Sequence, residues 1–553
     1  MPLPYAWDPE YVESHLFAYI GNKRRLLPLI AEAIRTVEEE GSVPVDRRGL
    51  FVDYFSGTGV VARLARSLGF SVHANDWEDY SKALNEAFLG YQESDLNVFA
   101  DEGGIDRVLG DLNRLGDYRP EDAYLSEFYC PADDTKPDIE KERLFYTRAN
   151  GIRLDNIRAE IDRRYPEGEG AETAKKRKIL LALLLVEASN RANTSGVFKG
   201  FHQGFGGLGA DALGRILHPV TLTRPRLPEN ASPGSVTRLD ALALAGQIEE
   251  EAEIAYLDPP YNQHQYGSNY HLLNTVVRND RPPVEKSFWK DGKKTDKSAI
   301  RKDWTETKSR FCSKATALAD FRALVARIRA KYILVSYSTD GLIPVEAMAE
   351  ILATRGKVRL VTAAYVRFRG GRQCNTTVNK NLEFVLVADT HAASGSGDLA
   401  ELRRALVLGR LAGMLSDPIP LDHLELRDGE IPLVVRLPID RRLRVGAAFK
   451  SIYEPLPLDM LEALQENLKS VLPKTRDEEI HRILDLLERG ADLDLAFLAK
   501  RVFTLFRKIH PQKSKEAWVG VARRLSAWLR PGTPFDPTGL DARSRKALAN
   551  LAA

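Results

Sequence analysis

The residues of this sequence best suited to chemistry are Tyr256-Leu-Asp-Pro-Pro-Tyr-Asn262, which follow a short apolar run. Proline cannot donate a hydrogen bond to a strand, and it pushes the preceding residue out of helical geometry. Asp258 and Pro259 therefore belong to a rigid extended turn at the end of a strand. Open α/β sheets bind their ligands at the carboxyl ends of their strands, so we expect a reactive site at this turn.

The turn offers two hydrogen-bond acceptors that suit an amino nitrogen. An aromatic amino group is a weak nucleophile because its lone pair is delocalised into the ring. The Asp258 carboxylate and the Pro259 carbonyl, fixed by Pro259 and Pro260, can accept its hydrogens and localise that pair through positioning and preorganised electrostatics. Tyr261 would then stack on an extruded base. The alternative is a structural turn in which Asp258 accepts only local hydrogen bonds.

A second motif, Asp53-Tyr-Phe-Ser-Gly-Thr-Gly59, lies between an apolar run and an amphipathic segment. Gly57 and Gly59 would let a strand turn into a helix and leave room for a ligand to approach the backbone. Asp76 ends the next predicted strand, where an acidic residue meets ribose hydroxyls in nucleotide-binding folds. The alternative is a tight connection in which Asp76 only caps a helix.

This glycine motif favours a nucleoside ligand without a pyrophosphate. It lacks the third glycine of a dinucleotide-binding turn and the lysine of a phosphate-binding loop. S-adenosylmethionine is such a ligand, and a methyl group is then the group to transfer. We expect no metal site, because the three cysteines, Cys130, Cys312 and Cys374, lie far apart in the sequence and lack metal-binding spacing.

The composition is that of an ordinary globular protein of several domains. The chain has 553 residues, of which 44% are hydrophobic and 28% charged. Its net charge is only +2, so local patches must identify any polyanionic partner. The N-terminus lacks a signal-peptide pattern and the longest apolar run, 179–186, is too short to cross a bilayer, so we expect a cytoplasmic protein.

The elements that position the two motifs are predicted to form a doubly wound α/β sheet. Strands are predicted at 50–55, 71–76, 253–258, 331–338, 358–368 and 382–389. Helices are predicted at 178–190 and 318–330. The mostly helical segment between about residues 80 and 235 is interpreted as an insertion between two halves of the sheet.

The motifs and their order resemble those of the Dam-like DNA adenine methyltransferases of the alpha group. In that family an N-terminal lysine motif and the glycine motif precede a recognition insertion and the sequence DPPY. Phe17-Ala-Tyr-Ile-Gly-Asn-Lys23 resembles the lysine motif, the Asp53 to Gly59 stretch resembles the cofactor loop, and Asp76 resembles the ribose-binding acid. The resemblance covers about residues 15 to 390.

The resemblance implies methyl transfer from S-adenosylmethionine to the exocyclic amino group of adenine in duplex DNA, with base flipping. It implies cofactor binding by Tyr19, Lys23, Asp53, Phe55, Gly57, Gly59, Asp76 and Asp240. It implies catalysis by Asp258, Pro259, Pro260 and Tyr261. An aspartate before the two prolines favours adenine over cytosine as the target.

The expected architecture is a Rossmann-like S-adenosylmethionine-dependent methyltransferase sheet with a helical recognition insertion and a separate, mostly helical C-terminal domain. The methyltransferase domain is expected at 1–90 and 235–392, and the inserted target-recognition region at 91–234. A glycine-rich, polar stretch at 391–398 is the best linker. Residues 398–553 would form the C-terminal domain, whose role the sequence leaves open.

Two segments, 193–207 and 286–314, have the composition of a nucleic-acid-binding surface. The first alternates basic and aromatic residues with glycine, as in a base-reading loop, and the second is a basic strip suited to phosphates. The residues expected to contact DNA are Lys199, His202, Lys293, Lys294 and Arg301. Either segment could instead be an ordinary solvated loop.

Two other functions stay open at this point. The acceptor could be a cytosine amino group or RNA, or the chain could be a catalytically silent DNA-binding regulator. The expected partners are double-stranded DNA and a cognate restriction or defence protein. We expect a monomer of prokaryotic or phage origin.

Overall fold

The structure is a computed structural model whose described residues fall into two compact units. It describes residues 7–41, 48–116, 123–207, 212–290, 293–362, 383–395, 398–415, 453, 455–471, 473, 475–488, 495–509, 515–540 and 544–545. The first unit comprises the described residues up to 362 together with 383–398. The second unit comprises the described residues from 399 onward.

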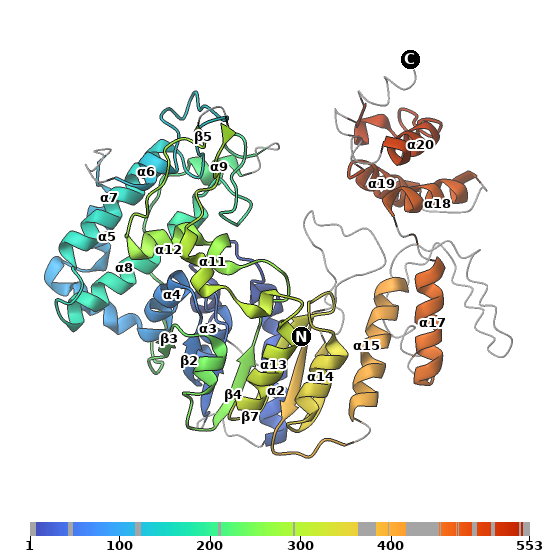
Figure 1. Cartoon of the computed structure of the whole chain (residues 1–553), viewed down its shortest axis with the longest axis horizontal. Helices are drawn as coiled ribbons and strands as arrows, with labels where there is room; N and C mark the ends of the chain where they lie inside the picture. Colours follow the sequence, from blue (N-terminus) through green and yellow to red (C-terminus); the bar gives the residue numbers. More distant parts are fainter. Residues whose placement is uncertain are drawn as a thin grey trace. The chain divides into compact units, whose positions relative to one another are not determined.

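The first unit is built on a seven-stranded sheet with the strand order β3-β2-β1-β4-β7-β9-β8 (Figure 1). Its strands are β1 (Leu50–Asp53), β2 (Ser71–Asn75), β3 (Ser235–Thr237), β4 (Ala252–Leu257), β7 (Ala330–Ser338), β8 (Lys357–Thr362) and β9 (Glu383–Asp389). Neighbouring strands are parallel, except that β9 runs antiparallel to β7 and β8. The predicted α/β fold is confirmed, and the strand order reverses between β1 and β4, where such sheets bind ligands.

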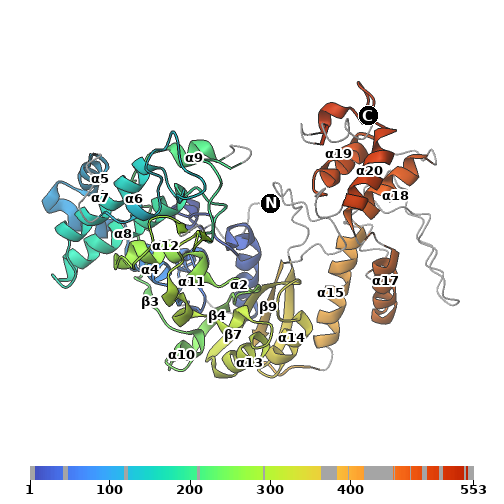
Figure 2. The ribbon, with the colours of Figure 1, turned by 45° about the horizontal axis from the view of Figure 1, so that its top comes forward.

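The predicted strands are present because their sequences suit burial on both faces of a sheet. Every residue of β4 is buried, as expected of a parallel strand that helices cover on both sides. Helices α2 (Leu27–Gly41) and α14 (Val345–Ala353) both contact β8 and β9, and α14 packs beside α13 (Ala317–Arg327) (Figure 2). Strand β3 was not predicted, because it has only three residues. Residues 363–368, predicted to continue β8, lie outside the described residues.

The segment between β2 and β3 is mostly helical, as the sequence predicts. Its main helices are α4 (Asp79–Gly90), α5 (Ile105–Asn113), α7 (Arg148–Arg164) and α8 (Ala171–Asn190). Helix α8 carries the apolar run 179–186, which is buried against α4, α7 and α12 (His271–Arg278). These helices gather beside the β3 edge of the sheet (Figure 1). The core of α5, α7 and α8 is continuous with that of α4 and α12, so the domain boundaries near residues 90 and 235 stay predictions.

The described part of the second unit is helical. Its helices are α15 (Asp398–Leu415), α17 (Leu458–Val471), α18 (Arg476–Glu488), α19 (Leu495–Phe506) and α20 (Lys515–Ser526). The first residue of α15, Asp398, is the last residue of the first unit. Buried residues of α18, α19 and α20, such as Ile480, Val502 and Val521, form one apolar cluster.

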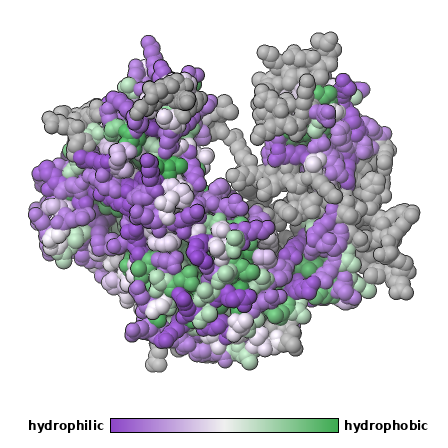
Figure 3. Space-filling view, in the orientation of Figure 1, coloured by the Kyte–Doolittle hydropathy of each residue, from purple (hydrophilic) through white to green (hydrophobic). Residues whose placement is uncertain are grey.

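Hydrophilic residues cover most of the visible face of the first unit (Figure 3). None of the described helices combines the length and apolar character needed to span a membrane.

Candidate active site

A cavity of about 850 Å³, counting its solvent-open part, lies where β1, β2, β3 and β4 end. Its lining residues are 19–23, 53–58, 60–61, 75–78, 239–241, 256, 258, 260, 266, 307, 309 and 311. This lining includes the predicted cofactor residues apart from Gly59, together with Asp258 and Pro260. Segments far apart in the sequence thus meet at the point where the strand order reverses.

The glycine turn after β1 is shaped by two residues with left-handed backbone angles. Gly57 has φ +51° and Gly59 has φ +79°, a conformation that glycine adopts without steric cost. A Cβ on Gly57 would lie 2.9 Å from Tyr19 Cε1, and one on Gly59 would lie 2.0 Å from Asn85 Oδ1. Gly57 therefore faces the cavity, whereas Gly59 packs against Asn85 where α3 (Val60–Ser67) begins.

Asp76 joins the glycine turn to the end of β2. Its Oδ2 accepts a hydrogen bond from Gly57 N at 2.9 Å, and its Oδ1 accepts one from Glu78 N at 3.0 Å. Burial raises the pKa of Asp76, while the amides of Gly57 and Glu78 act in the opposite direction. The carboxylate is thus fixed in the cavity wall by two backbone donors.

The lysine motif reaches the DPPY turn through an ion pair. Lys23 Nζ lies 2.9 Å from Asp258 Oδ1, and the side chains of Lys23 and Asp258 are 3% and 15% exposed. Burial raises the pKa of Asp258 and Lys23 lowers it. Burial acts to lower the pKa of Lys23, but Asp258, Tyr261 and Glu383 together raise it above its usual value. Lys23 is therefore held as a cation beside the proposed catalytic carboxylate.

A cluster of tyrosines positions the lysine motif. The Tyr19 ring stacks on Tyr270 with centroids 4.7 Å apart, and its hydroxyl is hydrogen bonded to the Tyr80 hydroxyl at 2.8 Å. The Ile20 amide donates to the Tyr270 hydroxyl at 2.8 Å. Since Tyr270 opens α12 and Tyr80 lies in α4, this backbone stretch is anchored to the core of the inserted helices.

Tyr261 lies beside the cavity lining. The Lys23 ammonium is 5.0 Å from the centroid of the Tyr261 ring, and this ring meets Tyr337 edge to face with centroids 5.9 Å apart. Pro259 and Tyr261 are not among the residues that line the cavity, whereas Pro260 is. Roles for Pro259 and Tyr261 in binding a base stay predictions.

Two further predicted cofactor residues occupy defined positions in the wall. The Asp240 side chain caps α10 (Ala241–Ala245) by accepting from Leu242 N at 2.9 Å. Asp53 is 1% exposed and ends β1. Burial and then the Asp258 charge raise the pKa of Asp53 well above its usual range. Asp258 therefore interacts electrostatically with both Asp53 and Lys23.

One wall of the cavity was missed from sequence. Thr307, Ser309 and Phe311 line it, although they belong to the segment predicted to be a basic strip for DNA. Phe311 meets Phe55 edge to face with centroids 5.2 Å apart. No local pattern marks these residues, because their role depends on the chain folding back over the glycine turn.

Trp77 and Glu78 also line the cavity and were missed. Their position directly after Asp76 is the signal that could have identified them. Glu78 is buried, and burial raises its pKa to about 7. Its carboxylate accepts from Asn274 Nδ2 at 2.7 Å.

The predicted DNA loop at 193–207 has a defined backbone. Asn193, which is fully buried, donates to the carbonyls of Leu144 and His202 and accepts from the Gly206 amide. Lys199 is exposed and His202 is half-buried. Lys199 is therefore accessible to a ligand, and its contact with DNA stays a prediction.

Within the basic strip, Arg301 is buried in ion pairs. Its side chain is 4% exposed, and its guanidinium pairs with Asp280 at 2.6 Å and with Asp303 at 2.7 Å. These carboxylates pair with its charge, and a phosphate contact by this residue stays a prediction. Lys293 and Lys294 form strand β6 opposite β5 (Trp289–Lys290), and their side chains lie outside the described part of the chain.

Comparison with known families gives one match over most of the first unit. The family of D12 class N6 adenine-specific DNA methyltransferases matches residues 19–203 and 234–349. These two ranges contain the lysine motif, the glycine turn, Asp76 and the DPPY turn. They also contain all the residues that line the cavity.

Individual relatives cover a similar part of the chain. The type II methyltransferase M.NlaIII of Neisseria lactamica is 32% identical over 371 residues, 66% of this chain and 96% of the relative. The type II methyltransferase M.CviAII of Paramecium bursaria Chlorella virus 1 is 26% identical over 64% of this chain and 92% of its own length. The modification methylase LlaI of Lactococcus lactis subsp. lactis is 26% identical over 67% of this chain, but only 54% of the relative is matched.

Proposed function

Because the chain belongs to the D12 class of N6 adenine-specific DNA methyltransferases, we propose that Asp258 and Pro259 hold the amino group of a flipped adenine beside bound S-adenosylmethionine. The reaction of this class is methyl transfer from S-adenosylmethionine to the N6 amino group of adenine in DNA. The observation that supports the assignment is the cavity shared by Gly57, Asp76 and Asp258. The family match favours adenine in DNA over a cytosine amino group or RNA.

The residues of the cavity fit the cofactor. Asp76 presents a carboxylate suited to ribose hydroxyls and is held by the Gly57 amide. Phe55, Trp77 and Phe311 supply flat apolar side chains suited to an adenine ring. When bound, S-adenosylmethionine supplies a methyl group carried on a positively charged sulfur. The carboxyl groups of the cavity would favour that charge.

Asp258 would act as a fixed acceptor. Lys23 favours the carboxylate form of Asp258, and a carboxylate only accepts hydrogen bonds. Asp258 and the Pro259 carbonyl would each accept one hydrogen of the amino group and so localise the nitrogen lone pair. Tyr261 would stack on the base and orient it.

The burial of the acceptor supports base flipping. The N6 amino group of adenine is paired inside a duplex, and Asp258 is only 15% exposed. A base in the stack cannot reach such a carboxylate, so the nucleotide must turn out of the helix. The proposed DNA-contacting surface is the loop 193–207, in which Lys199 is exposed.

Methyl transfer to duplex DNA tests the proposal. Purified protein should transfer labelled methyl groups, and digestion of the product to nucleosides should release N6-methyladenine. Asp258→Ala should abolish transfer while the affinity for S-adenosylmethionine stays near that of the wild type. No transfer to varied, unmethylated DNA would contradict the catalytic assignment, and tight DNA binding without transfer would favour the silent regulator.

The names of the relatives support a role in modification. M.NlaIII is a type II methyltransferase and LlaI a modification methylase, so we propose that this chain protects a site from a cognate restriction enzyme, acting as a monomer. Single-molecule sequencing of DNA from cells that express the protein would report the modified base and its context. Modification scattered without a sequence context would contradict this role.

A further inference from the structure

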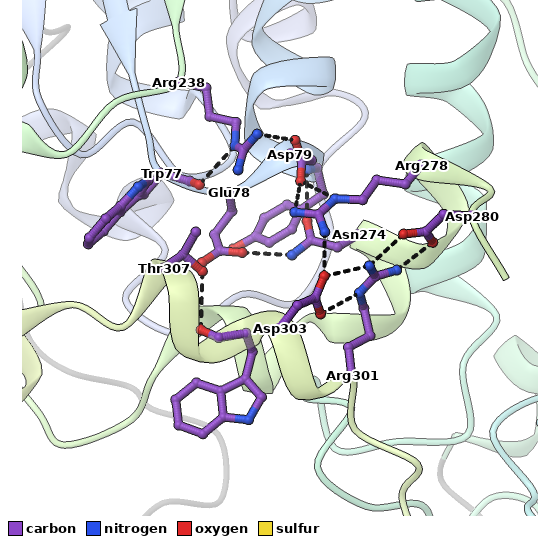
Figure 4. Close-up of polar contacts among 12 residues, drawn as sticks. Trp77, Glu78, Asp79, Arg238, Asn274, Arg278, Asp280, Arg301, Asp303 and Thr307 are labelled. Carbon is purple, nitrogen blue, oxygen red and sulfur yellow. Dashed lines mark hydrogen bonds and ion pairs between the residues drawn. The ribbon is translucent and has the colours of Figure 1, made fainter. Parts of the chain in front are cut away.

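A chain of ion pairs runs outside the cofactor cavity and alternates acidic and basic groups (Figure 4). Arg278 Nε donates to Asp79 Oδ2 at 2.6 Å, and Arg278 Nη1 donates to Asp303 Oδ2 at 2.6 Å. Arg301 then joins Asp303 to Asp280. These contacts link the start of α4, the end of α12 and the segment that follows residue 300.

The residues of this chain of ion pairs are directly attached to walls of the cavity. Asp79 follows Trp77 and Glu78, which line it. Asp303 lies in η4 (Lys302–Thr307), whose last residue, Thr307, also lines the cavity. Arg278 itself is not a lining residue. Its side chain therefore contacts Asp79 and Asp303, which adjoin two walls of the cavity, without lining the cavity itself.

A third wall of the cavity, formed by Leu239 and Asp240, is connected to Asp79 through Arg238. Arg238 Nη1 lies 3.0 Å from Asp79 Oδ1, and its Nε donates to the Trp77 carbonyl at 3.2 Å. Arg238 precedes Leu239 and Asp240, which line the cavity. Asp79 thus accepts from two arginines that come from different segments of the chain (Figure 4).

Hydrogen bonds to the Glu78 carboxyl group join the same segments next to the cavity. Asn274 donates through Nδ2 to Glu78 Oε2 at 2.7 Å and accepts from Tyr80 N at 3.1 Å. Thr307 also interacts with the Glu78 carboxyl group. The end of the wall near Ser309 is fixed separately by Gln265, which donates to the Ser309 carbonyl and accepts from its amide. The ion pairs thus hold the end of the wall near Asp303, and Gln265 holds the end near Ser309.

We propose that Arg278 is a positioning residue for S-adenosylmethionine, setting the separation of two cavity walls by binding Asp79 and Asp303 at once. Removing it would leave the contact between Thr307 and Glu78 to join η4 to the start of α4, with Asp79 paired to Arg238 and Asp303 paired to Arg301. The walls would then hold the cofactor less well, whereas Asp258 and Lys23 would keep their own ion pair. This inference rests on the proposed location of the cofactor in this cavity.

Cofactor affinity is the measurement that separates positioning from general stabilisation. For Arg278→Ala we expect the Kd for S-adenosylmethionine, measured by calorimetry, to rise about tenfold, which corresponds to about 1.4 kcal/mol. The kcat at saturating cofactor should stay within about twofold, because binding rather than the chemical step is affected. Asp303→Ala should also raise the Kd, and the effect of the double variant should be smaller than the sum of the two single effects, since both variants remove the contact between Arg278 and Asp303.

Arg177→Ala is the matched control. Arg177 also bridges two carboxylates, Asp162 and Glu167, and its side chain is 10% exposed, but it lies in α8 away from the cavity. It should lower the melting temperature without changing the Kd for the cofactor. The proposal is overturned if Arg278→Ala lowers the melting temperature but leaves the Kd unchanged, or if Arg177→Ala raises the Kd equally.

Two further variants keep the test decisive. If Arg278→Ala does not fold, Arg278→Lys retains the charge but lacks the planar fork needed to bridge Asp79 and Asp303, so it should still raise the Kd. Asp76→Ala tests the cavity itself. A raised Kd for Asp76→Ala with a normal Kd for Arg278→Ala overturns only the positioning role. A normal Kd for both variants overturns the cofactor site as well.

Discussion

Lys23 and Asp258 form a buried ion pair, with Nζ 2.9 Å from Oδ1. The pair connects the first motif of the sequence to the DPPY turn that follows β4. It also sets the charge of the proposed acceptor, since burial and Lys23 act on the pKa of Asp258 in opposite directions. The pH dependence of the reaction should therefore depend on the lysine.

Replacing Lys23 with methionine should move the acidic limb of the rate profile to higher pH. Without the cation, burial raises the pKa of Asp258 further, so the carboxylate form is lost at a higher pH than in the wild type. The measurement is kcat/KM for methyl transfer between about pH 5 and 9. Lys82→Met, which removes an exposed lysine of α4, is the control and should leave the profile in place.

Replacing Gly59 with alanine should destabilise the protein more than the same change at Gly104. Both glycines have positive φ, +79° and +92°, so both variants carry a backbone cost of about 1 to 3 kcal/mol. Only at Gly59 would the new Cβ meet another atom, Asn85 Oδ1 at 2.0 Å, whereas Gly104 has no atom within 4 Å. Urea unfolding should show a loss for Gly59→Ala at least about twice that for Gly104→Ala. Equal losses would show that the turn relaxes.

Replacing Glu78 with glutamine should stabilise the protein progressively as pH rises. The pKa of Glu78 is raised from 4.5 to about 7, so the folded state binds its proton more tightly than the unfolded state. The stability that this proton contributes is complete below about pH 4.5 and is lost as pH rises through about 7. Relative to the wild type, the variant should gain on the order of 3 kcal/mol across that range. A pH-independent difference in the free energy of unfolding would contradict this.

Removing residues 398–553 should leave methyl transfer to adenine intact. The cavity and the family match both lie within the first unit. We expect the shortened chain to give the same modified nucleoside with a kcat close to that of the full chain. If its KM for DNA or its sequence preference changes, the C-terminal helices contact DNA, and if transfer is lost, they are needed for the active fold.

The sheet and both central motifs were predictable because their signals are local. Apolar runs followed by glycine or proline indicated β1 and β4, and the turns after them line the cavity. Asp76 was predicted from its position at the end of the next strand, and the structure places it in contact with Gly57. In each case the residue type and its neighbours in sequence are sufficient.

The missed features depend on pairing between distant residues. Arg301 lies in a basic stretch, and composition alone did not indicate that Asp280 and Asp303 would bury its charge. Likewise, Thr307 and Phe311 reach the cavity only because the chain folds back over the glycine turn. Such contacts follow from the whole fold rather than from a periodic pattern.

The origin of the cavity walls has a consequence during protein synthesis. Its lining extends from Tyr19 to Phe311, and β4 pairs with β1 from across the whole inserted region. A nascent chain therefore carries both the glycine turn and the DPPY turn before it can complete a pocket around the cofactor. The ribosome must release the segment through Phe311 before the enzyme can first hold its methyl donor, so ligand-driven stabilisation comes late in folding.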